Sequence, residues 1–276
     1  MKLKNALILL LTATIWGVAF VAQSVGGSVG TFTFNATRSI LGFLFLLIVI
    51  LIQKIKITKQ SIIGGIGCGI CLFIAMTLQQ YGVVLSTVGK AGFITAFYIL
   101  LVPILGLVIG KRLNKQIIIG ILLAIIGLYF LCINEKLTIE IGDLLLLGCA
   151  LFYAIHILVI DHFVVSCDAI VMSCIQFLMV AVVSMICMLL FEDPQIEAIF
   201  DSWLPIVYAG VFSSGIAYTL QMIGQKGMDP TISSLILSLE SSISVLAGMI
   251  LLHSMLSLRE AIGCLFMFSA IMIAQK

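Results

Sequence analysis

The sequence predicts an all-α integral membrane protein, and its composition is the first reason. Hydrophobic residues make up 62% of the 276-residue chain, charged residues make up 9%, and the mean hydropathy is +1.31. A soluble domain carries roughly 25% charged residues, so this chain has too few of them to cover a globule in water. The net charge of +2 also argues against a nucleic-acid partner.

Long apolar runs are the second reason. About 20 apolar residues cross the hydrocarbon core as a helix, and ten runs of roughly this length are separated by short polar or glycine-rich breaks. The runs do not alternate apolar and polar residues, which argues against an outer-membrane barrel. The expected helices are 5–25, 31–53, 61–81, 89–110, 115–133, 141–160, 168–191, 203–223, 231–252 and 257–275. The first continues past Trp16 without a convincing cleavage site, so it is interpreted as a retained helix.

Lysine and arginine predict the orientation of these helices. With the N-terminus inside, the inner segments hold Lys2, Lys4, Lys54, Lys56, Lys59, Lys111, Arg112, Lys115, Lys226 and Lys276, and the outer segments hold Lys90, Lys136 and Arg259. Cytoplasmic loops carry the excess of basic residues. We therefore expect both termini in the cytoplasm and the chain in the inner or plasma membrane, as a monomer or homodimer surrounded by the lipid bilayer.

Two halves of the chain align with each other. The aligned segments and pairs are Thr77-Leu78-Gln79 with Thr219-Leu220-Gln221 and Tyr98 with Glu240 at a shift of 142, Arg38 with Gln176 at 138, and Trp16 with Tyr153 at 137. This pattern predicts two five-helix repeats, 1–137 and 138–276. Because five is odd, the second repeat crosses the membrane in the opposite sense. Such inverted repeats are typical of transporters that open alternately to the two sides of the membrane.

Several segments resemble bacterial members of the drug/metabolite transporter superfamily, EamA type. They are Trp16–Gln23, Gly89–Thr95 with the following Val102-Pro103, Ser213–Gln221 and Ser238-Leu239-Glu240. The resemblance covers the whole chain and implies ten helices in two inverted halves, a central cavity, and movement of small organic metabolites, often as export. The family's glutamate-proline step reads Glu240-Ser241 here, which argues against a proline break in the ninth helix. Its glycine-glutamate pair near the end of that helix reads His253-Ser254.

Glu240 is the first candidate for the substrate site. A charged group at membrane depth costs several kcal/mol, and Glu240 stands about ten residues into the ninth helix. A carboxylate at this depth suits binding of a substrate ammonium, or proton exchange that couples transport to the proton gradient. The alternative is a structural carboxylate that accepts hydrogen bonds from Ser238, Ser241 or Ser242.

Three more polar residues are candidates for substrate binding. Arg38 is expected nearer the outer surface, where it would pair with Glu240, bind an anionic group of the substrate, or extend to the membrane interface. Gln79 and Gln221 are equivalent in the repeat, so inverted symmetry would present both amides toward one axis. Interhelical hydrogen bonding is the competing role for these glutamines.

Aromatic residues and a histidine complete the predicted site. Trp16, Tyr98, Tyr153 and Tyr218 lie inside apolar runs rather than at the interfaces where aromatic belts form. They suit a cavity wall that binds organic cations or flat rings, although packing is the common role of such residues. His156 suits a proton shuttle, with a hydrogen-bonded interior histidine as the alternative.

The combined pattern predicts a secondary active transporter for amino acids, amines or related neutral or cationic solutes, working as an exporter by alternating access. The sequence has no Walker glycine loop and no helical His-Glu-x-x-His motif, so no enzyme, cofactor or metal is expected. Cys68-Gly-Ile-Cys71 resembles a redox motif in spacing alone. The alternatives are a lipid-modifying enzyme, for which Asp161-His162 is the one candidate pair, and a channel or structural subunit.

Overall fold

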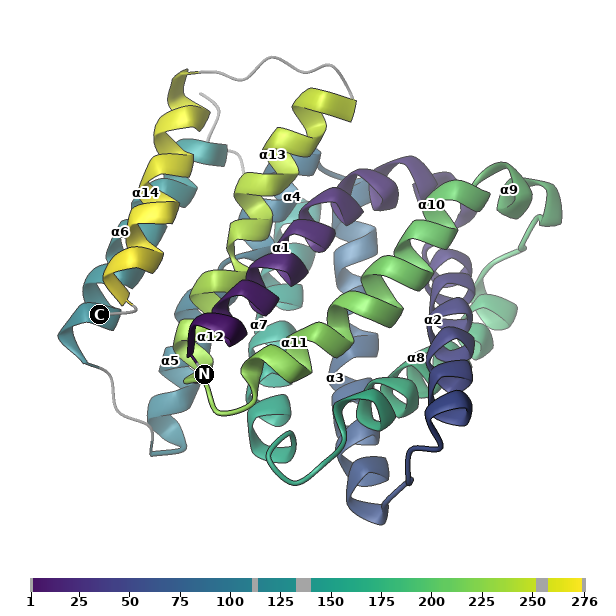
Figure 1. Ribbon diagram of the computed structural model, residues 1–276. Helices are drawn as coiled ribbons and strands as arrows, with labels where there is room; N and C mark the ends of the chain where they lie inside the picture. The colour runs from purple at the N-terminus through teal and green to yellow at the C-terminus, as the bar shows by residue number, and fades with distance from the viewer. Residues whose placement is uncertain (1, 111–113, 133–139, 252–257, 275–276) are drawn as a thin grey trace.

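A computed structural model describes residues 2–110, 114–132, 140–251 and 258–274, and the regular elements in these ranges are all helices (Figure 1). The first part of the chain holds α1 (Lys2–Val25), η1 (Gly26–Val29), α2 (Thr31–Gln53), α3 (Lys59–Val84), α4 (Val88–Thr95), α5 (Tyr98–Val108) and α6 (Lys115–Cys132). The second holds α7 (Ile141–Phe163), α8 (Ala169–Phe191), α9 (Ile196–Asp201), α10 (Trp203–Val207), η2 (Tyr208–Ala217), α11 (Tyr218–Gln225), α12 (Pro230–Leu237), α13 (Leu239–Leu251) and α14 (Leu258–Ala274).

Length and composition make this a multi-pass membrane protein. Within the described ranges, eight helical stretches are long and apolar enough to cross a membrane. Two shorter apolar helices, Lys115–Gly127 and Ala261–Ala270, lie where the fifth and tenth crossings were predicted. The all-helical membrane architecture is therefore as predicted, whereas the count of ten crossings and the inverted repeat stay predictions.

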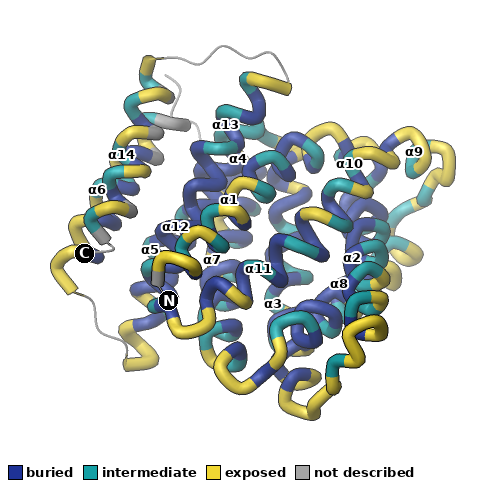
Figure 2. Tube along the Cα trace, viewed as in Figure 1, coloured by how far each residue is buried: buried dark blue, intermediate teal, exposed yellow. Residues whose placement is uncertain are grey.

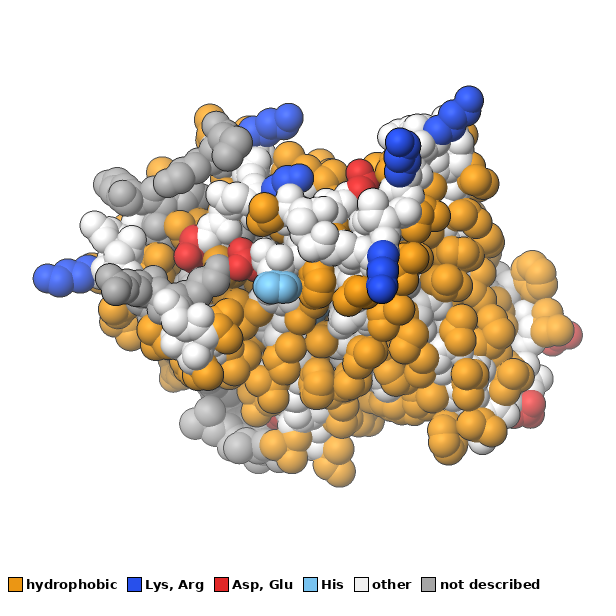
Figure 3. Space-filling model, turned by 90° about the horizontal axis from the view of Figure 1, so that it is seen from below, with side chains coloured by type: hydrophobic (Ala, Val, Ile, Leu, Met, Phe, Trp, Pro, Cys, Tyr) orange, Lys and Arg blue, Asp and Glu red, His pale blue; other side chains and the backbone are white. Residues whose placement is uncertain are grey.

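The distribution of side chains is that of a protein in lipid. Large apolar side chains such as Leu51, Ile66 and Leu189 are exposed on the outward helix faces, while Gln80 and Gln176 are fully buried. Figure 2 shows the exposed turns at the periphery and the buried ones around the centre. Figure 3, which views the molecule from below, shows lysine and arginine side chains beside a largely apolar surface. Lys111, Arg112, Lys136, Lys276 and the His253-Ser254 pair lie outside the described residues.

Helix packing brings the two parts of the chain together around a shared centre. α2 packs against α8, α3 packs against both α7 and α8, and α1 packs against α13 and against the stretch from α10 to α11. α6 and α14 pair with each other at one side of the molecule (Figure 1). The centre is therefore enclosed by α1, α2, α3, α7 and the broken helices described next.

Two predicted helices are each split near the middle of their length. The run 89–110 is divided into α4 and α5 by Ala96 and Phe97, and the run 231–252 is divided into α12 and α13 by Ser238. At both breaks the backbone changes to a tighter turn, because Phe97 N–H donates to Ile94 O at 3.1 Å and Ser241 N–H donates to Ser238 O at 3.1 Å. Both breaks lie at the centre of the molecule.

The two breaks differ in their local sequence. Pro103 lies inside α5, after the first break, and withdraws one N–H from the helical hydrogen bonds of that segment. In the ninth helix, Ser238 Oγ donates to Leu235 O at 2.8 Å and Ser241 Oγ donates to Ser238 O at 2.7 Å. Serine hydroxyls that bond to the preceding turn bend helices. The ninth helix therefore has no proline break, and serines stand at the break that it does have.

The predicted helix 203–223 also departs from regular α geometry. It is composed of α10, α11 and the intervening segment η2, which is a π-helix. A Cβ atom at Gly42 of α2 would lie 2.8 Å from Ser214 Cβ and 3.1 Å from Gly210 O. The glycine at this position therefore lets α2 approach the wider π-helical turns closely.

Glu192 joins the end of α8 to the start of α2. Its carboxylate accepts hydrogen bonds from Phe32 N–H at 2.9 Å, Thr33 N–H at 2.8 Å and the Thr33 hydroxyl at 2.7 Å. The positive end of the α2 dipole favours the negative charge. Gly30 precedes this cap with a φ of 100°, and a Cβ atom there would lie 2.7 Å from Glu192 Oε2.

The Glu192→Ala substitution is expected to lower the free energy of unfolding by about 1–3 kcal/mol, because it removes charged hydrogen-bond acceptors from a helix N-terminus. Thermal unfolding of the purified protein in detergent measures the effect. Glu197→Ala, at an exposed position of α9, is the control and should change stability by less than about 0.5 kcal/mol. Equal effects of the two substitutions would contradict the capping role.

Gly17 sets the distance between α1 and α13. A Cβ atom at Gly17 would lie 2.6 Å from Ile243 Cβ and 2.9 Å from Glu240 O. Gly17→Ala is therefore expected to destabilise the fold by about 1–3 kcal/mol through overpacking. Gly67→Ala is the matched control, since its Cβ would meet only Val159 Cγ1 at 3.6 Å. Thermal unfolding should separate the two variants, and equal stability would refute the packing role of Gly17.

Candidate functional site

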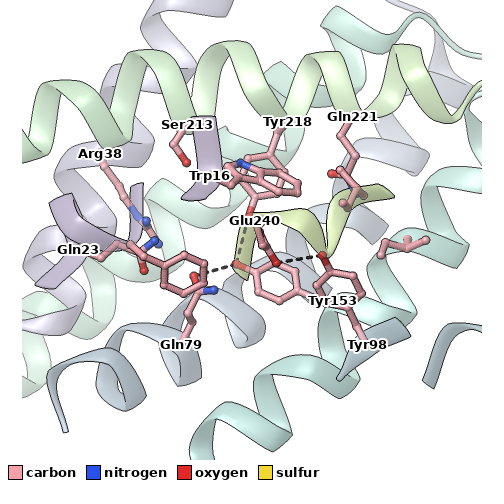
Figure 4. A pocket seen from close by; sticks show the side chains of 13 residues that line it. Trp16, Gln23, Arg38, Gln79, Tyr98, Tyr153, Ser213, Tyr218, Gln221 and Glu240 are labelled. Atoms are coloured by element: carbon pink, nitrogen blue, oxygen red, sulfur yellow. Dashed lines mark hydrogen bonds between the residues drawn. The ribbon is translucent and has the colours of Figure 1, made fainter. Parts of the chain in front are cut away.

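A cavity lies at the centre of the bundle, where both broken helices meet α1, α2, α3 and α7. The space between its lining atoms is about 440 Å³, including the part that opens outward. Its lining residues are Trp16, Phe20, Gln23, Arg38, Gln79, Tyr98, Tyr153, Ile157, Ser213, Tyr218, Gln221, Leu237 and Glu240. Figure 4 shows these side chains converging from helices far apart in sequence. The predicted site residues therefore lie together, with His156 as the exception.

Glu240 and Tyr98 meet at this cavity because each stands beside a helix break. Tyr98 is the first residue of α5 and Glu240 is the second residue of α13. The Tyr98 hydroxyl donates a hydrogen bond to Glu240 Oε1 at 2.9 Å, and Glu240 is only 4% exposed. Within the part of the chain that the structure describes, Oε2 receives no hydrogen bond. This oxygen is therefore available to a ligand in the cavity.

Serine hydroxyls are not the partners of the Glu240 carboxylate. The hydroxyls of Ser238 and Ser241 donate to backbone carbonyls one turn earlier. Ser242 Oγ is buried and has no hydrogen-bond partner among the described residues. The alternative of a serine-bonded structural carboxylate was therefore wrong, because a tyrosine from the other broken helix supplies the bond.

Tyr153 connects three sides of the cavity wall. Its hydroxyl donates to Gln79 Oε1 at 3.0 Å and lies 3.1 Å from the Tyr218 hydroxyl. Since the single hydrogen of Tyr153 goes to Gln79, Tyr218 is the donor in the second bond. The rings of Tyr218 and Trp16 are 4.6 Å apart at an interplanar angle of 56°. These contacts hold the aromatic wall in place.

The two equivalent glutamines reach the same cavity from α3 and α11 but differ in their bonding. Gln79 accepts the hydrogen bond from Tyr153, whereas Gln221 Oε1 is buried without a hydrogen-bond partner in the described ranges. The structure thus places Gln79 and Gln221 at the same cavity. Gln221 is the glutamine whose amide oxygen has no hydrogen-bond partner among the described residues.

Arg38 is buried at the cavity and does not pair with Glu240. Its side chain is 2% exposed, and Nε and Nη2 have no hydrogen-bond partner within the described residues. The guanidinium lies 5.3 Å from the centre of the Phe34 ring. The predicted pairing with Glu240 and the alternative of an interfacial position were both wrong, since Glu240 bonds to Tyr98 and the arginine points inward (Figure 4).

His156 lies behind the cavity wall and does not line it. Its Nε2 atom lies 3.0 Å from Gln176 Oε1, and its ring packs edge-on against Tyr218 at 5.9 Å. The residue is fully buried. His156 is therefore a hydrogen-bonded interior histidine packed against Tyr218, outside the residues that line the cavity, and its role at the substrate site stays a prediction.

Five lining residues were not among the predicted site residues. Phe20 and Gln23 follow Trp16 on one face of α1, and Ile157 follows Tyr153 by one turn on α7. Helical periodicity around the predicted aromatics was thus a signal that could have found these three. Leu237 precedes Glu240 by three residues, which is the same kind of signal, whereas Ser213 lies in the π-helix and had none.

The other predicted motifs lie outside the cavity. Cys68 and Cys71 are free thiols, and the described residues contain no group of three or more metal-ligating side chains. His162 packs its ring against Phe163 at the end of α7. Neither Asp161 nor His162 lines the cavity.

Comparison with known proteins identifies the family. The model of the EamA-like transporter family matches residues 3–133 and 140–274. The chain belongs to the EamA-like transporter family. This EamA-like protein is thus a membrane transporter, and the resemblance noted in its sequence is confirmed.

Two individual proteins are similar to this EamA-like chain over nearly its whole length. An uncharacterized transporter of Archaeoglobus fulgidus is 28% identical over 267 residues, which cover 96% of this chain and 83% of that protein. A protein of known crystal structure matches 100% of this chain and 99% of its own, with a TM-score of 0.84 and 21% identity. The second likeness is one of fold alone.

The hydrogen bond between the broken helices predicts the effect of Tyr98→Phe. Loss of the hydroxyl leaves the buried Glu240 carboxyl without its bond, so the free energy of unfolding should fall by about 1–3 kcal/mol. Tyr129→Phe, at an exposed position of α6, is the matched control and should have little effect. Thermal unfolding without added solute measures both, and an unchanged stability of Tyr98→Phe would contradict the importance of the bond.

Proposed function

We propose that this protein is a secondary active transporter that exports small organic metabolites by alternating access. The observation that carries the proposal is the central cavity, in which a carboxylate, two glutamines and an aromatic wall are enclosed by helices from both matched stretches. The substrates would be amino acids, amines or related neutral or cationic solutes. We propose the inner or plasma membrane as the location, with both termini in the cytoplasm.

Two inverted repeats, 1–137 and 138–276, would provide the two alternating conformations. The family model matches once in each of these ranges. The breaks at Ala96-Phe97 and Ser238 are counterparts at the same shift of 142 that aligns Gln79 with Gln221. α2 also packs against α8, its counterpart, and α6 packs against α14. These correspondences support a binding site on the axis between two related halves.

One contact at each end of the bundle would close the cavity toward that side of the membrane. At one end, Lys90 Nζ lies 2.8 Å from Asp143 Oδ2, joining α4 to α7. At the opposite end, Asn5 Nδ2 donates to Lys226 O at 2.8 Å. Each contact joins one matched stretch to the other. In the proposed cycle, each contact breaks when its side opens and re-forms when that side closes.

The cavity chemistry favours a solute with a positive or neutral polar group. Glu240 Oε2 would accept a hydrogen bond from an ammonium, and the faces of Trp16 and Tyr218 would attract a cation or a flat ring. The Gln221 amide would bind a neutral polar group. Transport is favoured over the lipid-enzyme alternative because the Asp161-His162 pair lies away from the cavity. Export as the direction is supported by the family resemblance alone.

Ligand-induced stabilisation of the purified protein across a panel of amino acids and amines, at two pH values, tests the function. A solute at 100 times its Kd should add about 2.7 kcal/mol to the stability of the folded state. Glu240→Gln should abolish this effect for cationic solutes, whereas Glu197→Gln, on an exposed residue of α9, should retain it. Equal stabilisation of the Glu240→Gln variant would refute the role of the carboxylate.

A further inference from the structure

We propose that Arg38 forms an anion subsite in the central cavity, and that the solute it selects is a zwitterion whose carboxylate binds Arg38 and whose ammonium binds Glu240. The proposal rests on the transport function proposed above and narrows its substrate class. Three independent features carry it: the bonding of Arg38, the contrast with its repeat counterpart, and the position of Ser213.

The bonding state of Arg38 is the first feature. The guanidinium is 2% exposed and lines the cavity, and the described part of the chain offers Nε and Nη2 no acceptor. An arginine at this depth is costly unless its charge is balanced. The acidic residue that lines the same cavity, Glu240, is bound to Tyr98 instead. Arg38 thus lines the cavity and keeps two buried donors that no described residue uses.

The second feature is the contrast between Arg38 and Gln176, the residue that aligns with it in the repeat. Arg38 aligns with Gln176 at a shift of 138, and Gln176 is bonded to His156 of α7 at 3.0 Å. At the shift of 137 that aligns α1 with α7, the residue equivalent to His156 is Ala19. A methyl group cannot accept a hydrogen bond. The hydrogen bond that joins α7 to α8 therefore has no counterpart between α1 and α2, and the Arg38 side chain lines the cavity without it.

Ser213 supplies a second donor on the same side. It belongs to the π-helix η2 and lines the cavity (Figure 4). One turn beyond Arg38 on α2, Gly42 allows η2 to approach closely. An arginine fork binds a carboxylate through two parallel hydrogen bonds, and a nearby hydroxyl adds a third. A carboxylate therefore suits this end of the cavity.

A zwitterion would use both charged groups at once. In Figure 4, Arg38 enters from the side of Gln23, and the bond between Glu240 and Tyr98 lies on the other side of Gln79. A solute between them would place its carboxylate at Arg38 and its ammonium at Glu240 Oε2, with its side chain against the aromatic wall. An amine without the carboxylate leaves Arg38 unbalanced, and an acid without the ammonium leaves Glu240 unbalanced.

Two matched solute series test the inference on the purified full-length protein. The probes are leucine with isopentylamine and 4-methylpentanoate, and phenylalanine with phenethylamine and 3-phenylpropanoate. Binding is measured by calorimetry and thermal stabilisation at pH 7. For at least one series, the zwitterion should bind roughly 10- to 100-fold more tightly than either singly charged analogue, because each analogue loses hydrogen bonds to a charged group.

Substitutions of Arg38 test whether this residue binds the carboxylate of the solute. Arg38→Gln should weaken binding of the zwitterion roughly 10- to 100-fold, to the level of the amine, while leaving the affinity for the amine within about threefold. Arg38→Lys keeps the charge and loses the fork, so its affinity for the zwitterion should lie between those of wild type and Arg38→Gln. Arg259→Gln, on α14 outside the cavity, is the control and should bind all probes as wild type does.

The outcomes separate this inference from the function on which it rests. Equal binding of zwitterion and amine by wild-type protein, or unchanged zwitterion affinity in a folded Arg38→Gln variant, would overturn the anion subsite and leave transport of amines intact. Failure of every probe to bind the folded wild-type protein would overturn both. The wild-type series requires no variant, so the test stands even where Arg38→Gln fails to fold.

Discussion

Hydrogen bonding within lipid limits where a membrane protein can interrupt a helix, since no water is present to satisfy the freed backbone groups. This chain interrupts two helices at its centre and satisfies the breaks with tight turns and serine hydroxyls. The hydrogen bond from Tyr98 to Glu240 then joins the two breaks. The cavity, its aromatic wall and the position of its carboxylate all depend on this junction.

The two halves use aligned residues differently around this junction. Tyr98 and Glu240 occupy aligned positions, and one donates to the other. Gln79 is bonded within the wall, whereas its counterpart Gln221 keeps a free acceptor. Two stretches that match the same family model thus enclose a cavity whose lining is not symmetric. Such asymmetry is needed for a solute with two different ends, because a symmetric lining would present the same groups to both.

Packing between the halves is close where the cavity is formed and polar at the ends of the bundle. Gly17 and Gly42 let α1 and α2 approach the elements that carry Glu240 and Ser213. The ion pair of Lys90 with Asp143 lies instead at a helix end, with the lysine partly exposed and the aspartate buried. Such contacts at the two ends are the ones that the proposed transport cycle would break and re-form.

The sequence alone determined the membrane fold, the family and most of the residues of the cavity. Composition and run length decide these features locally, because a helix in lipid needs only its own apolar residues and internal hydrogen bonds. A charged residue within such a helix, such as Glu240, costs free energy in lipid, and a tyrosine far from the membrane interfaces, such as Tyr153, is unusual. Both can therefore be recognised as candidate site residues from the sequence. The family resemblance relied on motifs of the same local kind.

Only the tertiary structure decided which of these residues bond to each other. Glu240 is bound by Tyr98 rather than by Arg38 or the neighbouring serines, and His156 is bound by Gln176 behind Tyr218. The breaks at Ala96-Phe97 and Ser238 rotate the following segments and so select which side chains face the cavity. Partner choice depends on distances between segments far apart in sequence, and helical periodicity does not contain that information.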